Sequence, residues 1–194
     1  MILKTARFVL LAAALWLGAG TAAHALDLRD VLERTRVSPP DRVAFRETRH
    51  NPLLREPLEL TGYLEYPQAG QLRKVVESPF QESMLVDGDT IELVRDGRTR
   101  RVSLKNRKSM LSMLQSIESL LAGNTEMLER LFELELTGTA ENWQLRLTPI
   151  AARLAKQLDR LTVCGGERAI NEIRFDMQNG EWQHLEIIQA PAEP

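Results

Sequence analysis

The segment Thr61–Val94 constrains the fold most, because it holds four short strand patterns with a turn signal at each junction. Pro67 and Gly70 end the first pattern, Pro79 ends the second, and Asp87-Gly88-Asp89 joins the third to the fourth. Asp-Gly favours a hairpin because glycine adopts a positive φ at little cost. Such a meander predicts one antiparallel sheet, which can leave one face in water and must cover the other.

Over the whole chain, the patterns predict about ten strands and three helical segments. Most of the strands are apolar on one side only. In Leu58–Tyr66, for example, Leu60 and Leu64 share a face and alternate with polar residues. Two stacked sheets would satisfy this pattern, and so would one strongly curved sheet with helices in its concavity. The helical hairpin Met110–Phe132 interrupts the strands, which favours the curved sheet.

This hairpin has apolar residues at three- and four-residue spacing, which is typical of an amphipathic helix. Ser109 is the predicted N-cap, Gly123 the residue that ends the helix, and Asn124 or Thr125 the cap of a second short helix. Its face is rich in Met and Leu. Because Met is flexible and polarisable, such a face can repack around ligands of varied shape. The same spacing is equally that of an ordinary core face, and periodicity alone does not decide between them.

The first 25 residues have the pattern of a secretory signal peptide. Lys4 and Arg7 precede the apolar run Phe8–Ala19, and Ala23-His24-Ala25 is a small-x-small cleavage site. Cleavage is expected after Ala25, which would leave residues 26–194 as a single domain in the periplasm or outside the cell. The apolar run is short for a membrane span, and no second such run follows.

Composition and motifs argue against several classes of protein. Acidic residues outnumber basic ones, 27 to 25, which does not suggest a nucleic-acid binder. Cys164 is the only cysteine, so no internal disulfide can form, and it is expected to be a buried apolar residue. After cleavage His50 and His184 would be the only histidines, and neither has a second ligand at metal-binding spacing. No catalytic residue, metal site or cofactor is therefore predicted.

Two acidic patterns have simple structural interpretations. Asp87-Gly88-Asp89 lacks the ligand ladder of a calcium loop and is expected to be a turn. Glu133 and Glu135 alternate with leucines, which indicates the wet face of a strand and not a catalytic pair.

The order of short motifs resembles the periplasmic outer-membrane lipoprotein carrier (LolA-type) family. An export signal and a short helix are followed by the strand Leu60-Thr-Gly-Tyr-Leu-Glu-Tyr-Pro and by Leu72-Arg-Lys-Val-Val-Glu-Ser-Pro. The hairpin sequence Met84-Leu-Val-Asp-Gly-Asp, the helical hairpin and Trp143-Gln-Leu-Arg-Leu-Thr-Pro come next. Each motif is short, but together they extend over nearly the whole chain after the leader.

The resemblance implies an unclosed antiparallel half-barrel with helices as a lid over an apolar cavity. It also implies a periplasmic carrier, expected to be a monomer, that shelters the acyl chains of a lipoprotein or other lipidated cargo. Its expected partners are a membrane-bound donor and an outer-membrane acceptor. The candidate cavity and lid residues are Leu60, Leu64, Tyr66, Met110, Leu111, Met113, Leu114, Ile117, Leu120, Leu121, Met127, Leu128, Leu145 and Leu147.

The chain departs from the family pattern at Glu65-Tyr66-Pro67, because members of the family carry a basic residue immediately before this proline. The departure favours another acylated cargo, such as a glycolipid or a polyene-type lipid. Two other functions remain open. One is a periplasmic lipid-sensing or regulatory module on the same fold, and the other is a small hydrolase that uses the cavity.

Overall fold

The computed structural model describes residues 26–188, so the predicted leader at 1–25 and the residues from 189 onward lie outside it. Four helices occur in this range: α1 (Leu28–Arg34), α2 (Lys108–Ala122), α3 (Thr125–Leu131) and α4 (Ala152–Ala155). The first six strands are β1 (Asp41–His50), β2 (Leu58–Gln68), β3 (Gln71–Ser78), β4 (Glu82–Asp87), β5 (Thr90–Arg95) and β6 (Arg98–Ser103). The other five are β7 (Phe132–Thr139), β8 (Asn142–Pro149), β9 (Leu158–Gly165), β10 (Ile170–Met177) and β11 (Trp182–Ile188).

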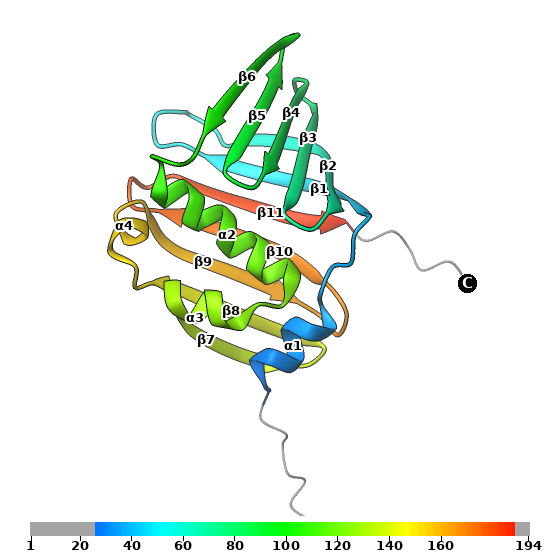
Figure 1. Cartoon of the computed structure of the whole chain (residues 1–194), viewed down its shortest axis with the longest axis vertical. Helices are drawn as coiled ribbons and strands as arrows, with labels where there is room; N and C mark the ends of the chain where they lie inside the picture. Colours follow the sequence, from blue (N-terminus) through cyan, green and yellow to red (C-terminus); the bar gives the residue numbers. More distant parts are fainter. Residues whose placement is uncertain (1–25, 189–194) are drawn as a thin grey trace, which may run out of the picture.

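All of these strands belong to one antiparallel sheet in the order β6-β5-β4-β3-β2-β1-β11-β10-β9-β8-β7 (Figure 1). Strands β1–β6 form one meander and β7–β11 a second. The pairing of β1 with β11, in which Phe45 lies opposite Ile187, joins the two meanders in the middle of the sheet. Strands β6 and β7 are the two edges, so the sheet is not closed.

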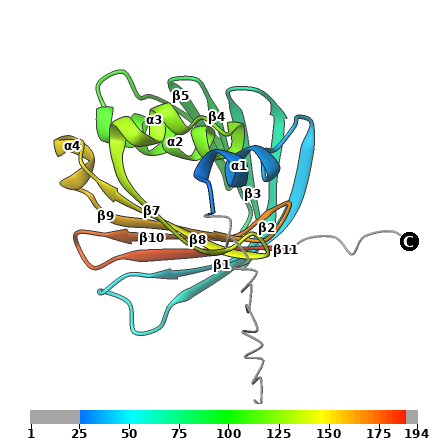
Figure 2. The same ribbon diagram turned by 90° about the horizontal axis from the view of Figure 1, so that it is seen from below.

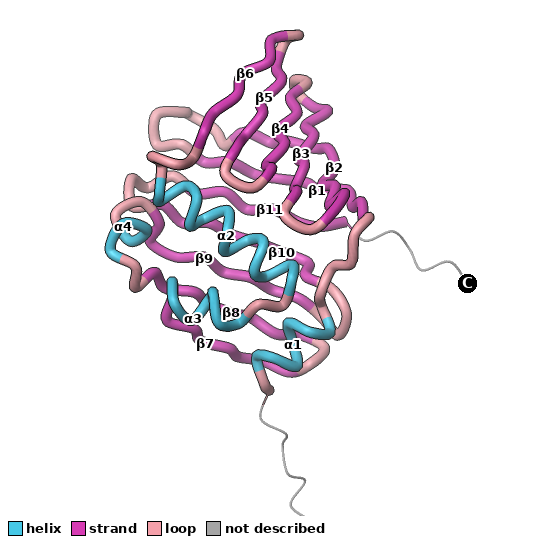
Figure 3. Tube along the Cα trace, viewed as in Figure 1, coloured by secondary structure: helices cyan, strands magenta, loops and turns pink. Residues whose placement is uncertain are grey.

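The helices lie on the concave side of this sheet, as the view from below shows (Figure 2). Helix α2 crosses in front of the central strands and packs against α1, α3 and α4, and the colouring by secondary structure shows the same layering (Figure 3). The prediction of one curved sheet with helices in its concavity is confirmed. The predicted count of about ten strands becomes eleven.

The close approach of β2 and β3 depends on Gly62, which lies opposite Val76. A Cβ atom at position 62 would overlap the carbonyl oxygen of Val75 in β3. The register between the two strands also shifts next to Gly62, as it does at a bulge. Only glycine therefore fits this position.

Strand β2 extends to Gln68 and so passes Pro67, which was predicted to end it. The reason is a second register shift, between Glu65 and Gln68. Because the strand pairing is irregular there, no regular hydrogen bond of the sheet requires the backbone N–H that Pro67 lacks.

The best-packed part of the core lies between the C-terminal half of the sheet and the helices. Trp143 of β8 is 1% exposed, and its indole N–H donates to the carbonyl oxygen of Gly166 over 2.8 Å. Leu32, Leu120 and Leu128 bring α1, α2 and α3 into the same cluster. Burial of such side chains contributes roughly 1.5–3 kcal/mol each, so this cluster anchors the helices to the sheet.

The helix ends agree with the sequence in two of three predicted places, and α1 has a side-chain cap as well. The Asp27 carboxylate accepts a hydrogen bond from the backbone N–H of Arg29 at the start of α1. The Asn124 side chain caps α3, and Gly123 ends α2 with a φ of 71°. Helix α2, however, begins at Lys108, one residue before the predicted cap Ser109. A turn that ends at Arg107 sets this earlier start, because the Arg107 carbonyl oxygen already accepts from the Leu111 N–H over 3.0 Å.

Candidate functional site

Helix α2 covers the concave face of the sheet and is called the lid below. Its C-terminal end is joined to the α1–β1 linker, because the Val37 N–H donates to the Leu121 carbonyl oxygen over 2.9 Å. Ser116, Ser119 and Leu120 are its buried residues. The lid therefore rests on side-chain packing and on the neighbouring helices, and it forms no ladder with the sheet.

The larger of the two spaces under the lid, called the main cavity below, has a volume of about 240 Å³. It lies between the lid, the α1–β1 linker and the ends of β1, β2 and β11. Its apolar wall includes Val43, Leu64, Leu72, Ile187 and the lid residue Leu121. The polar residues along it are Thr35, Arg36, Ser38, Asp41, Arg42, Glu65 and Arg168. The cavity thus has an apolar wall with charged side chains around it, the arrangement usual for ligand pockets.

A smaller void of about 30 Å³ lies between the lid and β2–β4. Its lid side is formed by Leu111, Leu114 and Leu121, together with the polar residues Gln115 and Glu118. Tyr66 and Leu72 form part of its other side and also line the main cavity, as does Leu121. The two spaces are therefore separated by only a few side chains.

The predicted cavity residues fall into three groups. Five line one or both of these spaces: Leu64, Tyr66, Leu111, Leu114 and Leu121. Five are packed in the core with at most 1% exposed: Leu60, Leu120, Leu128, Leu145 and Leu147. Four lie elsewhere on α2 and α3: Met113, Ile117 and Met127, which are half-buried, and Met110, which is exposed at the start of the lid.

Sequence reasoning missed Leu72, which lines both spaces from β3. The signal was present, because Leu72 and Val76 fall on one face of a strand that alternates with period two. It was masked by the intervening charged residues Arg73 and Lys74.

A second feature that sequence reasoning missed is a cluster of charges on the same concave face. Glu47 of β1 is 1% exposed and lies between Leu60 of β2 and Leu185 of β11 in the sheet register. Its carboxylate contacts the Lys74 ammonium group and accepts from the Arg49 Nε over 2.8 Å. The Lys74 nitrogen also lies 4.7 Å from the centre of the Phe45 ring.

Burial and pairing act in opposite directions on this cluster. Burial raises the pKa of the Glu47 carboxyl, but the positive charges of Lys74 and Arg49 outweigh it and leave the pKa below its ordinary value of 4.5. Burial lowers the pKa of Lys74, and Glu47 offsets this only in part. The sequence signal was the alternation of Val43, Phe45, Glu47 and Arg49, which places two charges on the apolar face of β1.

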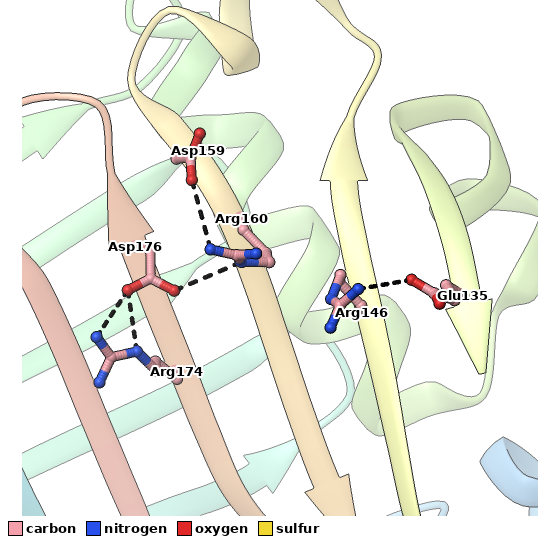
Figure 4. A network of polar contacts seen from close by, with 6 residues as sticks. All are labelled: Glu135, Arg146, Asp159, Arg160, Arg174 and Asp176. Carbon is pink, nitrogen blue, oxygen red and sulfur yellow. Dashed lines mark hydrogen bonds and ion pairs between the residues drawn. The ribbon is translucent and has the colours of Figure 1, made fainter. Parts of the chain in front are cut away.

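The convex face is a solvent-exposed ladder of ion pairs, part of which is seen from close by in Figure 4. Arg146 and Glu135 are 2.8 Å apart across β7 and β8, and Arg174 and Asp176 are 2.8 Å apart within β10. Glu133 and Glu135 are exposed here, as expected for the wet face of a strand. Exposed pairs of this kind contribute at most about 1 kcal/mol each.

His50, His184 and Cys164 lie on the convex face as well. The His184 Nε2 is 3.1 Å from a Glu172 carboxylate oxygen, and His50 stacks on Trp182 at 5.5 Å between ring centres. Cys164 is half-buried, and burial raises the pKa of its thiol. Among residues 26–188 no three His, Cys, Asp or Glu side chains are placed to hold a metal ion.

Comparison with known proteins gives one family. The family described as outer membrane lipoprotein carrier protein LolA-like matches residues 19–192. No curated protein sequence matches the chain.

Several solved structures are similar to the chain at low sequence identity. A LolA superfamily protein from Nitrosomonas europaea is 13% identical, with 88% of this chain and 96% of that chain covered and a TM-score of 0.44. The lipoprotein LppX from Mycobacterium tuberculosis is 14% identical, with 86% and 97% covered and a TM-score of 0.45. A chain of the Pseudomonas aeruginosa MucA/MucB complex is 15% identical, with 87% and 59% covered and a TM-score of 0.39.

Proposed function

The chain belongs to the LolA-like outer membrane lipoprotein carrier family, which is generally non-enzymatic, and we propose that it carries an acylated cargo beneath the lid α2. The cargo is a lipoprotein or another lipidated molecule, such as a glycolipid or a polyene-type lipid. The observation that supports this most is the wall shared by the two spaces under the lid. Leu121 of the lid and Tyr66 and Leu72 of the sheet line both spaces.

The size of the main cavity implies that the lid moves when cargo binds. Its volume of about 240 Å³ is below the roughly 300–1,000 Å³ usual for small-molecule pockets. An outward shift of α2 would join the main cavity to the void beneath Leu111 and Leu114. The acyl chains would then replace the lid's side chains against the apolar concave face.

The energetic reason for a carrier is the cost of exposing acyl chains to water, about 0.8 kcal/mol per CH₂ group. An apolar space between sheet and lid removes most of this cost. The main cavity also has charged residues beside it, including Asp41, Arg42 and Arg168. These side chains keep the polar part of the cargo in contact with water and with charged groups.

The proposed place of action is the periplasm. A leader at residues 1–25 directs export and is cleaved after Ala25, which leaves residues 26–194 as one monomeric domain. The carrier takes its cargo from a membrane-bound donor and delivers it to an outer-membrane acceptor. Within residues 26–188, none of the helices has the length and apolar character that a membrane crossing requires.

Two experiments test the carrier function. The first extracts lipid from protein purified from the periplasm of its own host and identifies it by mass spectrometry. The second measures binding of a fluorescent fatty-acid probe. A protein that contains no lipid and binds no acyl probe would contradict the proposal.

The lid is tested by Leu114→Glu, which puts a charge into the smaller void and should weaken probe binding about tenfold or more. The matched control is Leu85→Glu, because Leu85 is also half-buried but lies on the convex side of β4, opposite Arg73 and Glu92. Equal affinity in both variants would place the acyl site away from the lid.

A further inference from the structure

One end of the molecule displays two adjacent exposed leucines. The loop between β1 and β2 carries Leu53, which is 92% exposed, and Leu54, which is 52% exposed. Asn51 holds this loop in a fixed shape, because its side-chain oxygen accepts from the Leu53 N–H and its carbonyl oxygen from the Leu54 N–H, both over 2.9 Å. Two adjacent leucines are thus presented to solvent on a hydrogen-bonded turn.

The turn between β10 and β11 supports this loop from beside it. The Asn51 amide donates to the Glu181 carboxylate over 2.7 Å, and Pro52 lies close to Gly180. Directly behind the loop, Trp182 stacks on His50, and the Arg174 guanidinium lies 4.5 Å from the centre of the Trp182 ring. Tryptophan and arginine at the base of an apolar tip are the residues that favour the headgroup region of a bilayer.

The same end of the molecule carries a cluster of positive charges. A hollow between the start of the lid and α4 is lined by Arg107, Lys108, Arg153 and Lys156, all of them exposed, and by no carboxylate. None of these four side chains forms an ion pair with another residue of the range 26–188. Two exposed apolar residues are close to the hollow in the chain: Met110 follows Ser109, and Ile150 comes shortly before α4.

The register of the sheet places the leucine loop and the hollow at one end. His50 of β1 pairs with Trp182 of β11, and the strands continue through β10 and β9 to the end of β8 beside α4. The Gln178 N–H also donates to the Gln157 carbonyl oxygen over 2.8 Å, which links the β10–β11 turn to the segment after α4. Figures 1 and 2 both show the β1–β2 loop, α4 and the start of α2 on the same side.

Acidic residues at this end do not cancel the positive charge. Asp159 is paired with Arg160 at 3.7 Å. Glu181 accepts from the neutral Asn51 amide and keeps its negative charge, which is one charge against the four cations of the hollow. Glu56 follows Arg55 in the leucine loop. The four cations of the hollow are therefore in excess.

We propose that this end, defined by Leu53, Leu54 and the basic hollow, docks reversibly onto a bilayer that contains anionic phospholipid. The leucines enter the boundary between headgroups and acyl chains, and the cations lie against the phosphates. A bilayer fits better than a protein partner, because the apolar residues project from a turn and line no groove. This proposal does not rest on the carrier function, since the main cavity lies toward the other end of β1 and β2.

The test is flotation of the purified protein with vesicles of phosphatidylethanolamine and phosphatidylglycerol, compared with vesicles of neutral phosphatidylcholine. We expect binding to the anionic vesicles that weakens at high salt. The double variant Leu53→Glu/Leu54→Glu should bind about tenfold or more weakly, since burial of even one leucine changes partitioning by that factor. Arg107→Glu/Lys156→Glu should remove most of the salt-sensitive binding.

Two matched controls carry the same chemical changes elsewhere. Ile188→Glu replaces an exposed apolar residue at the opposite end of β11, and Arg29→Glu/Arg98→Glu reverses two exposed cations on α1 and β6. Both should float as the unchanged protein does. Failure of the unchanged protein to bind anionic vesicles overturns the proposal. Equal loss in the control variants, or full binding by the leucine variant, also overturns it.

Discussion

The carboxylate of Glu47 and the ammonium group of Lys74 face each other on the concave side of the sheet, from strands β1 and β3. Strand β2 lies between these two strands, so the pair spans it on the face that the lid covers. Arg49 binds the other carboxylate oxygen, so a buried negative charge is held by two positive ones. A compact group of three charges is therefore held on the face of the sheet that the lid covers.

Removal of Lys74 should be strongly destabilising. In Lys74→Met the Glu47 carboxylate keeps Arg49 but loses its closest partner in a buried position, and the free energy of unfolding should fall by roughly 3 kcal/mol. Denaturant unfolding followed by circular dichroism measures this. Arg46→Met is the control, because Arg46 pairs with Glu186 at 3.7 Å on the exposed convex face and should change stability by less than about 1 kcal/mol.

Replacement of both Glu47 and Lys74 by apolar residues should recover most of the free energy of unfolding that Lys74→Met loses. The double variant Glu47→Leu/Lys74→Met leaves no buried charge unpaired, since Arg49 is partly exposed and can turn to solvent. Buried ion pairs replaced by apolar residues are often neutral or stabilising. A double variant that is less stable than Lys74→Met alone would show that the pair contributes through its geometry and not through charge compensation.

The same carboxylate predicts a dependence of stability on pH. The pKa of Glu47 is below its ordinary value of 4.5, because Lys74 and Arg49 outweigh the effect of burial. A lowered carboxyl pKa contributes stability that is complete above the unfolded value and is lost as the pH falls through the folded value. The stability difference between the unchanged protein and Glu47→Gln should therefore be constant near neutral pH and shrink below about pH 4.5. A difference that grows on acidification would contradict this assignment.

The close approach of β2 and β3 at Gly62 gives a fourth prediction. A methyl group at this position overlaps the Val75 carbonyl oxygen, so Gly62→Ala must push β3 away from β2. We expect a loss of several kcal/mol, since strain and lost ladder hydrogen bonds add to each other. Gly88→Ala is the comparison, because position 88 has a φ of 55° but open space around it and should lose only about 1 kcal/mol.

The sequence predicted the features that depend on local periodicity. Alternation in Leu58–Tyr66 placed Leu60 and Leu64 on the covered face, and helical spacing located the lid to within two residues. It did not predict the partner of Glu47, because Lys74 is 27 residues away and meets it only through the register of β1, β2 and β3. It also could not separate Leu145, which is fully packed, from Leu64, which lines a cavity, because both have the same pattern of alternation.

The last prediction concerns Tyr66, whose ring contributes to the wall between the two spaces under the lid. Tyr66→Ala should join them into one larger cavity, so that less of the lid must be displaced by an acyl chain. The variant should be less stable by roughly 2–5 kcal/mol, as large-to-small core substitutions are. It should nevertheless bind the fatty-acid probe more tightly, because part of the site is then formed in advance.

Phe132→Ala separates these two effects. Phe132 is 2% exposed in the core but lines neither space. Its truncation should lower stability to a similar extent with no gain in probe affinity. Calorimetric titration with the probe, together with a thermal melt of each variant, distinguishes the two residues. Tighter binding in both variants would mean that general loosening of the core admits the probe, and weaker binding in Tyr66→Ala would mean that the tyrosine ring itself contacts the acyl chain.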